Sequence, residues 1–256
     1  MKAGDKVRSL IRGLEILEAI NRHNGANLNQ VAQDTKLSRG TAYRMLESLC
    51  DAGFLERRTN SNGYWLSARI PSLSSGYRSD AWVSQIAEPA LEKLTRAYAW
   101  PCSLLIPTDL RMICLAHTEH LSPVTFRRRR IGLAMSMFDT ASGLAYLAFA
   151  APETQANLLT SAPTPAKAQG KATAGLLKST LTQIRKRGYH IVDSPDRGSV
   201  LSVPILVNDT AFGSLSLRFF TSAMSHALAV NTYLTPLRQA ARDLGDALES
   251  MSAHPF

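Results

Sequence analysis

The feature that most constrains this chain is a set of three short helical patterns near the N-terminus, separated by tight breaks. Apolar residues recur at helical spacing in 7–21, which gives one apolar face and one charged face. Asn29 stands in an N-cap position for a second helix that ends near Leu37, and Ser38 caps a third. Gly53 then suits the left-handed turn after a helix. This pattern predicts a helix-turn-helix unit.

A β-hairpin is predicted directly after the third helix. Residues 54–58 and 64–66 are rich in strand-forming side chains, and they flank a polar, turn-forming segment at 59–63. Three helices followed by a basic hairpin make a winged helix-turn-helix, in which the recognition helix enters the major groove of DNA. We therefore expect residues 1–67 to form a winged helix-turn-helix DNA-binding domain.

Candidate DNA contacts follow from this geometry. A recognition helix reads base edges with side chains near its N-terminus, while other groups hold phosphates. Arginine can donate two hydrogen bonds to guanine, and threonine can contact a thymine methyl group. In an unrelated domain such arginines would be solvated surface groups, so the winged-helix context carries the interpretation. The predicted DNA-binding residues are Ser38, Arg39, Thr41, Tyr43, Arg44, Arg57 and Arg58.

The remainder of the chain interleaves short apolar runs with helical patterns, which predicts an α+β domain. We expect a linker at 68–82, partly helical through an amphipathic run that continues to Tyr98, and a second domain at 83–256. Residues 161–175 lack an apolar period and are expected to form a surface loop. Predicted strands are 102–107, 111–117, 124–130, 189–193, 200–207 and 212–220, and predicted helices are 140–150 and a last one between Pro236 and Met251.

Composition narrows the function classes. Lys and Arg number 29 against 20 Asp and Glu, a net charge of +9, which favours phosphate polyanions or anionic ligands only weakly. No apolar run approaches the ~20 residues of a membrane-spanning helix, and the N-terminus lacks a signal-peptide pattern, so we expect a cytoplasmic protein. The 3 cysteines form no C-x-x-C pair and are expected to be reduced, without a disulfide framework.

Several segments together resemble the IclR family of bacterial transcriptional regulators. Segments 28–32, 37–49 and 53–55 resemble its DNA-binding domain, and 139–149, 185–189, 202–205 and 213–217 resemble its effector-binding domain, in the family's order. The resemblance implies a GAF-like second domain with a small-molecule effector pocket, and assembly into a homodimer or homotetramer. Leu144 stands where the family usually has a basic residue, so any role of that residue has no counterpart here.

The residues themselves also point to an anion site in the second domain. Asp139 is placed to cap the helix at 140–150, whose small first-turn side chains would leave backbone N–H groups open to a carboxylate or phosphate; a closely packed, capped core helix is the alternative. Alternation in 212–220 puts Ser216 and Arg218 on one strand face, and a parallel strand expected at 200–205 offers Ser202 and Pro204 on one face. A buried arginine needs a partner, either an internal acid such as Asp193 or an incoming anion.

Carried onto this sequence, the resemblance nominates an effector pocket suited to an aromatic or other small carboxylate. Trp100-Pro101 and the spacing from Phe126 through Gly132 to Asp139 look most like members that regulate aromatic-acid catabolism. The nominated residues are Ala141, Ser142, Gly143, Asp193, Ser202, Pro204, Ser216 and Arg218, with Met112, Phe126 and Met135 as apolar walls.

A single winged helix specifies few base pairs, so we expect at least a dimer on a pseudo-palindromic operator. The basic run Arg127–Arg130 is usually a solvated face, with contact to DNA, a partner copy or the effector as the alternative. The sequence leaves open the effector, the operator, and activation as against repression.

Enzymatic functions find little support. His117 and His120 lack a third ligand, and no phosphate-binding loop occurs, so no metal or cofactor is predicted. Ser142 lacks the G-x-S-x-G elbow, which leaves a hydrolase using Ser142 with His117 or His190 as a remote rival. A nearer rival is a DNA-binding architectural protein whose second domain only oligomerises.

Overall fold

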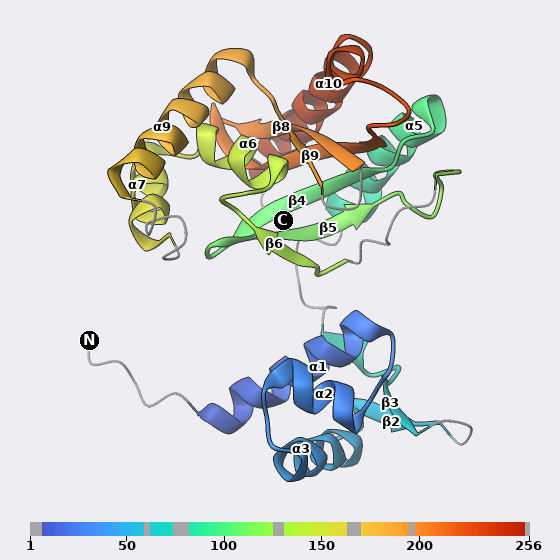
Figure 1. Ribbon diagram of the computed structural model, residues 1–256. Helices are drawn as coiled ribbons and strands as arrows, with labels where there is room; N and C mark the ends of the chain where they lie inside the picture. The colour runs from blue at the N-terminus through green and yellow to red at the C-terminus, as the bar shows by residue number, and fades with distance from the viewer. Residues whose placement is uncertain are drawn as a thin grey trace. The chain divides into compact units, whose positions relative to one another are not determined.

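The computed structural model describes residues 7–58, 62–73, 82–124, 131–162, 170–194 and 198–253. The chain divides into two compact units, Met1–Arg78 and Ser79–Phe256, and the division falls within the expected linker segment (Figure 1). No helix in the described ranges is long and apolar enough to cross a membrane.

The N-terminal unit is a winged helix-turn-helix, as the sequence predicts. Its core joins Ile16 and Ile20 of the first helix to Val31, Leu46 and Leu55. Its elements are α1 (Arg8–His23), β1 (Ala26–Asn27), α2 (Leu28–Thr35), α3 (Arg39–Asp51), β2 (Leu55–Arg57), β3 (Gly63–Leu66) and a short 3₁₀ turn at Ile70–Leu73. The strands pair antiparallel in the order β1-β3-β2, so the predicted hairpin is confirmed.

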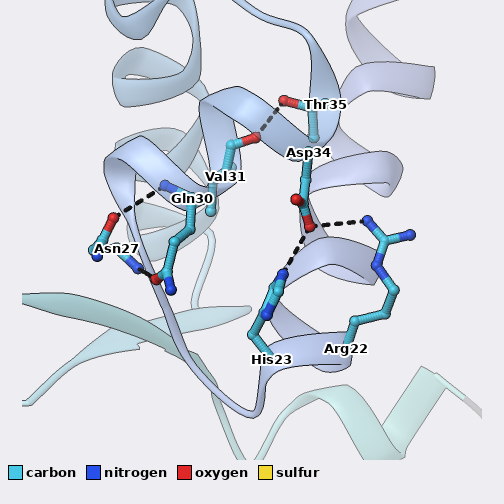
Figure 2. A network of polar contacts seen from close by, with 7 residues as sticks. All are labelled: Arg22, His23, Asn27, Gln30, Val31, Asp34 and Thr35. Carbon is cyan, nitrogen blue, oxygen red and sulfur yellow. Dashed lines mark hydrogen bonds and ion pairs between the residues drawn. The ribbon is translucent and has the colours of Figure 1, made fainter. Parts of the chain in front are cut away.

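The start of α2 differs from the expectation. Asn27, not Asn29, is the N-cap: its side chain accepts from the backbone N–H of Gln30 at 3.0 Å, and the Gln30 side chain accepts from the N–H of Asn27 at 2.9 Å (Figure 2). This reciprocal capping box satisfies two N–H groups that a helix end leaves unpaired. Asn29 was the wrong choice because the helix already begins at Leu28.

A second polar contact fixes α1 against α2. Asp34 Oδ2 lies 2.8 Å from His23 Nε2 and 3.3 Å from Arg22 Nη2 (Figure 2). The hydrogen bond with His23 is the main cause that holds the pKa of Asp34 below its usual range. The contact therefore orients α2 through its C-terminal turn, as the capping box does at its start.

Replacing each asparagine separately with alanine tests this capping assignment. Asn27→Ala is expected to lower the unfolding free energy of the N-terminal unit by about 1 kcal/mol, the usual cost of a lost N-cap. Asn29→Ala, two residues away, is the matched control and should change it by no more than about 0.5 kcal/mol. Thermal or urea unfolding, followed by circular dichroism, measures both free energies. Equal losses in the two variants would contradict the assignment of Asn27 as the N-cap.

The C-terminal unit is α+β, and its described part contains one six-stranded antiparallel sheet in the order β6-β5-β4-β9-β8-β7. A π-helical turn at Val83–Ala87 (η2) leads into the first helix. The elements are α5 (Glu88–Tyr98), β4 (Cys102–Thr108), β5 (Arg111–His117), β6 (Ala134–Ser136), α6 (Ala141–Phe149), α7 (Pro152–Ser161), α9 (Gly170–Arg187), β7 (His190–Asp193), β8 (Gly198–Val207), β9 (Thr210–Phe220) and α10 (His226–Ala253).

Each face of this sheet buries its own apolar cluster. One cluster joins α5 and α10 to Leu201, Leu217 and Phe219 of the strands. The other joins α6 and α9 to Leu105 and Met112. Figure 1 shows α6, α7 and α9 gathered at one side of the sheet and α10 with α5 at another. We call the side of the sheet that packs against α5 and α10 the α10 face, and the side that packs against α6 and α9 the α6 face.

Four expectations about this unit need correction. The strand at 200–207 is antiparallel to β9, not parallel. The last helix begins at His226, so Pro236 lies inside it, because Ala229 and Leu234 already bury against the sheet. From Gly170 onward the expected loop is part of α9. Trp82, the last residue of the expected linker, is buried in the core of this unit together with the amphipathic run that follows it to Tyr98. Phe126, Arg127–Arg130 and all but the first residue of the strand predicted at 124–130 lie outside the described residues.

Candidate nucleic-acid interface and ligand pocket

A groove of about 590 Å³ opens on the N-terminal unit between α3, the start of α2 and the hairpin. Three arginines line it and no acidic residue does, although Arg57 and Arg58 pair with Glu47 and Glu56 outside the lining, so the lining carries a net positive charge that these glutamates reduce. Such a surface is suited to phosphate and base edges. Its lining residues are Asn27, Leu28, Asn29, Arg39, Tyr43, Arg57, Arg58, Asn62, Gly63 and Tyr64.

The groove unites four of the seven predicted contact residues: Arg39, Tyr43, Arg57 and Arg58. Arg44 is exposed on α3 outside the lining. Ser38 and Thr41 form the N-terminal cap of α3, with the Ser38 hydroxyl 2.9 Å from that of Thr41. Sequence reasoning missed the asparagines at the start of α2, which the corrected helix start would have indicated.

Arg57 is held in place rather than free. Its guanidinium donates to Glu47 of α3 and, at 2.9 Å, to the hydroxyl of Tyr64, which in turn donates to Glu47 at 3.0 Å. Hydrogen bonding to Tyr64 is the first cause that raises the pKa of Arg57, followed by Tyr43 and Glu47. This contact fixes the hairpin against the recognition helix, so both can meet one DNA surface in a set geometry.

Buried hydroxyls gather on the α6 face of the C-terminal unit. The hydroxyl of Ser216 lies 2.7 Å from that of Ser202 and 3.1 Å from that of Ser142, and all three residues are buried. Ser103 pairs with Ser216 in the sheet and is also buried. Three linked hydroxyls use two of their protons on each other, which leaves one O–H able to donate to a ligand.

Arg218 lies two residues after Ser216 in β9, on the same face of the sheet as the hydroxyl cluster. It is 7% exposed, and its Nη1 lies 3.7 Å from Oε1 of Glu119, which is equally buried. The internal acid expected for Arg218 is therefore Glu119 and not Asp193. Its position in the turn after β5 gave no sequence signal, because the contact depends on how β4 pairs with both β5 and β9.

Asp193 lies on the other face of the sheet. Its carboxylate accepts from the hydroxyl of Ser199 at 2.5 Å and lies 2.8 Å from Nε2 of His226, at the start of α10. These two contacts hold the pKa of Asp193 below its usual range, with Ser199 the larger cause. The structure does not bring Asp193 together with Ser216 and Arg218.

The start of α6 also differs from the expectation. Its N-cap is Thr140, not Asp139, and the N–H of Gly143 donates to the Thr140 hydroxyl at 3.1 Å. A Cβ on Gly143 would lie 2.2 Å from the carbonyl oxygen of Met137, so this glycine permits close packing. The N–H of Gly143 is thus occupied by the cap, while the hydroxyl of Ser142 faces the sheet.

The other residues predicted to line the effector pocket lie near the hydroxyl cluster, in the α6-face core or in a different groove. Met112 and Met135 are opposite each other in β5 and β6 and belong to the α6-face core. Ala141 is buried in the first turn of α6. Pro204 lies two residues beyond Ser202 and lines a different groove at the sheet edge.

His190, predicted only as the base of a remote hydrolase alternative, has a partly buried imidazole. It pairs with Ser202 in the sheet, and its Nδ1 is buried without a hydrogen-bond partner among the described residues. Burial, with a smaller contribution from Arg187, lowers the pKa of His190 to about 4. The imidazole is therefore neutral in the folded unit near neutral pH.

This burial predicts an acid sensitivity. Below pH 6.5 the unfolded chain protonates His190 while the folded unit does not, so stability falls as pH drops from about 6.5 to about 4 and then levels off. The loss attributable to His190 is expected to reach about 3 kcal/mol at most. Urea unfolding at pH 7 and pH 4.5 should show a smaller difference in His190→Gln than in the native chain, whereas the exposed control His120→Gln should show the native difference.

The enzymatic alternatives gain nothing from the geometry. The hydroxyl of Ser142 contacts that of Ser216. No group of three His, Cys, Asp or Glu residues able to hold a metal occurs in the part of the chain that the structure describes. Burial raises the pKa of the Cys102 thiol to about 12, which makes it a poor nucleophile.

One apolar surface was not anticipated by the site predictions. Val7, Leu10, Ile11 and Leu14 are exposed on the first half of α1, whereas Ile16 and the residues that follow it enter the core. Four apolar side chains at helical spacing form a continuous stripe, which we call the α1 stripe. Exposed stripes of this kind mark protein interfaces.

Comparison with known families covers both units. A model described as the IclR helix-turn-helix domain matches residues 9–59, and one described as the bacterial transcriptional regulator IclR C-terminal domain matches residues 76–246. Both parts of the resemblance drawn from the sequence are thereby confirmed.

Individual relatives agree with the family models. An uncharacterized HTH-type transcriptional regulator of Haemophilus influenzae is 25% identical over 56% of this chain and 53% of that protein. The p-hydroxybenzoate hydroxylase transcriptional activator of Acinetobacter baylyi is 30% identical over 46% of this chain and 43% of its own. The chain thus spans about half the length of these two curated relatives, which are regulators and not enzymes.

Solved structures confirm the fold. An IclR homolog from Microbacterium hydrocarbonoxydans, described as complexed with 4-hydroxybenzoate, superposes with a TM-score of 0.72 at 21% identity. The match covers 94% of this chain and 99% of that one.

Proposed function

Because the chain belongs to the IclR family of bacterial transcriptional regulators, we propose that it binds operator DNA through its N-terminal unit under the control of a small carboxylate in its C-terminal unit. The observation that carries the DNA part is the acid-free groove lined by Arg39, Arg57 and Arg58. Arg39 at the start of α3 is placed to read a base edge, while the hairpin arginines hold phosphates. Such a regulator acts in the cytoplasm, where bacterial DNA lies.

The hydroxyl cluster supports the ligand part of the proposal. Ser142, Ser202 and Ser216 supply a hydrogen-bond donor, and Arg218, whose charge Glu119 partly offsets, supplies a guanidinium that a carboxylate can bind. Met112 and Met135 supply apolar contact for an aromatic ring. One relative is named the p-hydroxybenzoate hydroxylase transcriptional activator, and one similar structure is described as complexed with 4-hydroxybenzoate, so aromatic acids are the first class to test.

The α1 stripe supports dimerisation. Pairing two copies through α1 would bury both stripes and hold two recognition helices at a fixed spacing, as a pseudo-palindromic operator requires. A ligand that prefers one spacing then shifts the population that binds DNA.

The test is operator binding measured by fluorescence anisotropy on duplexes from upstream of the protein's own gene. The double variant Arg39→Ala, Arg44→Ala is expected to weaken specific binding at least about tenfold, because a bidentate arginine–guanine pair contributes ~1–3 kcal/mol. The control Arg96→Ala, Lys178→Ala removes two exposed charges from the C-terminal unit and should leave affinity within about twofold. Native affinity in the α3 double variant would overturn the interface.

Ligand control is tested separately by thermal shift. A ligand that binds only the folded state raises the unfolding midpoint, so 4-hydroxybenzoate, benzoate and aliphatic acids form the first panel. A shift together with altered operator affinity supports the proposal. Operator binding that stays indifferent to every acid would favour the architectural alternative, in which the second unit only oligomerises.

A further inference from the structure

A second groove lies on the C-terminal unit, at the end of α6 away from Ser142. Phe149 and the β8 residues Val203, Pro204 and Leu206 form an apolar part of its lining. The strand is open here because β7 pairs with β8 only as far as Ser202. The groove measures about 510 Å³, which is within the size range of small-molecule sites.

Five cationic side chains from two helices converge on this groove. Arg185, Lys186 and Arg187 end α9, and Arg238 and Arg242 project from the middle of α10. Within the described ranges, none of the five forms an ion pair with an acidic side chain. The helix dipole accounts for cations at the end of α9, but it does not account for those of α10.

Two of the arginines lie near the ring of one tyrosine. The guanidinium carbons of Arg187 and Arg238 lie 5.3 Å and 6.0 Å from the ring centre of Tyr189, and Arg238 donates to the carbonyl oxygen of Arg187. Gly188 lies between Arg187 and Tyr189 with a φ of +72°, a conformation that glycine adopts without strain. Nε of Arg187 is buried without a hydrogen-bond partner among the described residues. Two guanidinium groups near one ring, one of them with an N–H that is unpartnered in the described part of the chain, favour a bound anion.

The opposite end of the groove carries acceptors. Arg238, Arg242, Asp246 and Glu249 follow one another along one face of α10, so the charge changes sign along the groove. Asp209 joins the acidic end, and Glu249 is fixed there by the backbone N–H of Asn208 at 2.5 Å. A bare polyphosphate would be repelled by this end, whereas hydroxyl groups can donate to it.

We propose that this groove binds a phosphate-bearing small metabolite with a hydroxylated body. The phosphate lies between Arg187 and Arg238, and the hydroxyl groups donate to Asp246 and Glu249. The apolar side chains of Phe149 and Pro204 contact the body between the two ends. The site is separate from the hydroxyl cluster near Ser142, so it would give the protein a second small-molecule input.

Isothermal titration calorimetry on the full chain tests this, with ribose 5-phosphate, ADP and inorganic phosphate as probes. At least one of the two phosphate esters should bind saturably below about 1 mM and more tightly than inorganic phosphate. Lys186→Glu, Arg242→Glu changes two exposed groove cations and should weaken that binding at least about tenfold. The control Arg96→Glu, Lys178→Glu makes the same charge change on exposed residues elsewhere and should leave it within about twofold.

A second variant tests the acidic end. Asp246→Asn, Glu249→Gln should reduce the ratio of the affinity for the phosphate ester to the affinity for inorganic phosphate. An unchanged ratio would overturn the placement of the hydroxyl groups. Absence of saturable ester binding up to about 5 mM, or binding that the Lys186→Glu, Arg242→Glu chain retains in full, would overturn the site. Loss of non-specific duplex affinity in that chain, without ester binding, would reassign the groove to DNA.

Discussion

Leu10→Glu, Leu14→Glu is expected to convert the protein to a form with unpaired N-terminal units and to lower its operator affinity by about 100-fold or more. Both leucines are exposed on the α1 stripe, so the substitutions leave the core of the N-terminal unit intact. Their effect would come from placing carboxylates in an apolar interface. Because a dimer contacts two half-sites, a single unit loses about half of the specific contacts.

Sedimentation velocity and fluorescence anisotropy measure the two parts of this prediction. Leu176→Glu, Leu228→Glu is the matched control, since both residues are exposed leucines outside α1. The control should keep native assembly and native affinity. A stripe variant that remains fully assembled and binds the operator as tightly as the native chain would remove α1 from the interface.

The N-terminal unit could be predicted from sequence because its signals are local. Ser38 caps α3, and Gly53 follows it with a positive φ of 75°. Each of these features depends on residues within a few positions of one another. Asn27 was missed in favour of Asn29 because both asparagines satisfy the composition rule, and only the reciprocal contact with Gln30 distinguishes them.

Most strands of the C-terminal unit and its helices α6 and α10 were predictable, whereas β6, α7, α9 and the long-range pairing of the strands were not. Alternation in β9 placed Ser216 and Arg218 on one face, and the structure agrees. The partner of Arg218 depends on β4 lying between β5 and β9, which no local pattern encodes. The register of β7, β8 and β9 separates Asp193 from Arg218: Asp193 pairs with Ser199 and Ser199 with Phe219, so Asp193 and Arg218 lie on opposite faces.

The sequence also could not reveal which exposed apolar and charged side chains lie together on the folded surface. The α1 stripe reads as an ordinary amphipathic helix, because periodicity does not say where the core ends along it. The cations of the second groove come from segments about 50 residues apart, and their convergence depends on the packing of α10 against β8.

The second large effect concerns Arg218. Arg218→Met, Glu119→Gln removes both charges of the buried pair and is expected to abolish the response of operator binding to a carboxylate ligand. Replacing one partner alone would leave a buried charge unpaired, at a cost of about 3–5 kcal/mol, and could unfold the unit. The double change avoids this cost, so it should leave the unit folded with ligand-free operator affinity within about twofold of native.

The exposed pair of Arg96 and Glu92 on α5 offers a control of identical chemistry. Its Nη2–Oε2 distance is 3.3 Å, and the pair is far more solvated than Arg218 and Glu119. Arg96→Met, Glu92→Gln should keep the native ligand response, because surface ion pairs contribute little. Operator titrations at increasing concentrations of whichever acid shifts the native melting midpoint compare the three chains. A half-maximal concentration in Arg218→Met, Glu119→Gln equal to the native one would show that the carboxylate does not bind at Arg218, and the positive partner of the ligand would then have to be sought elsewhere on the α6 face.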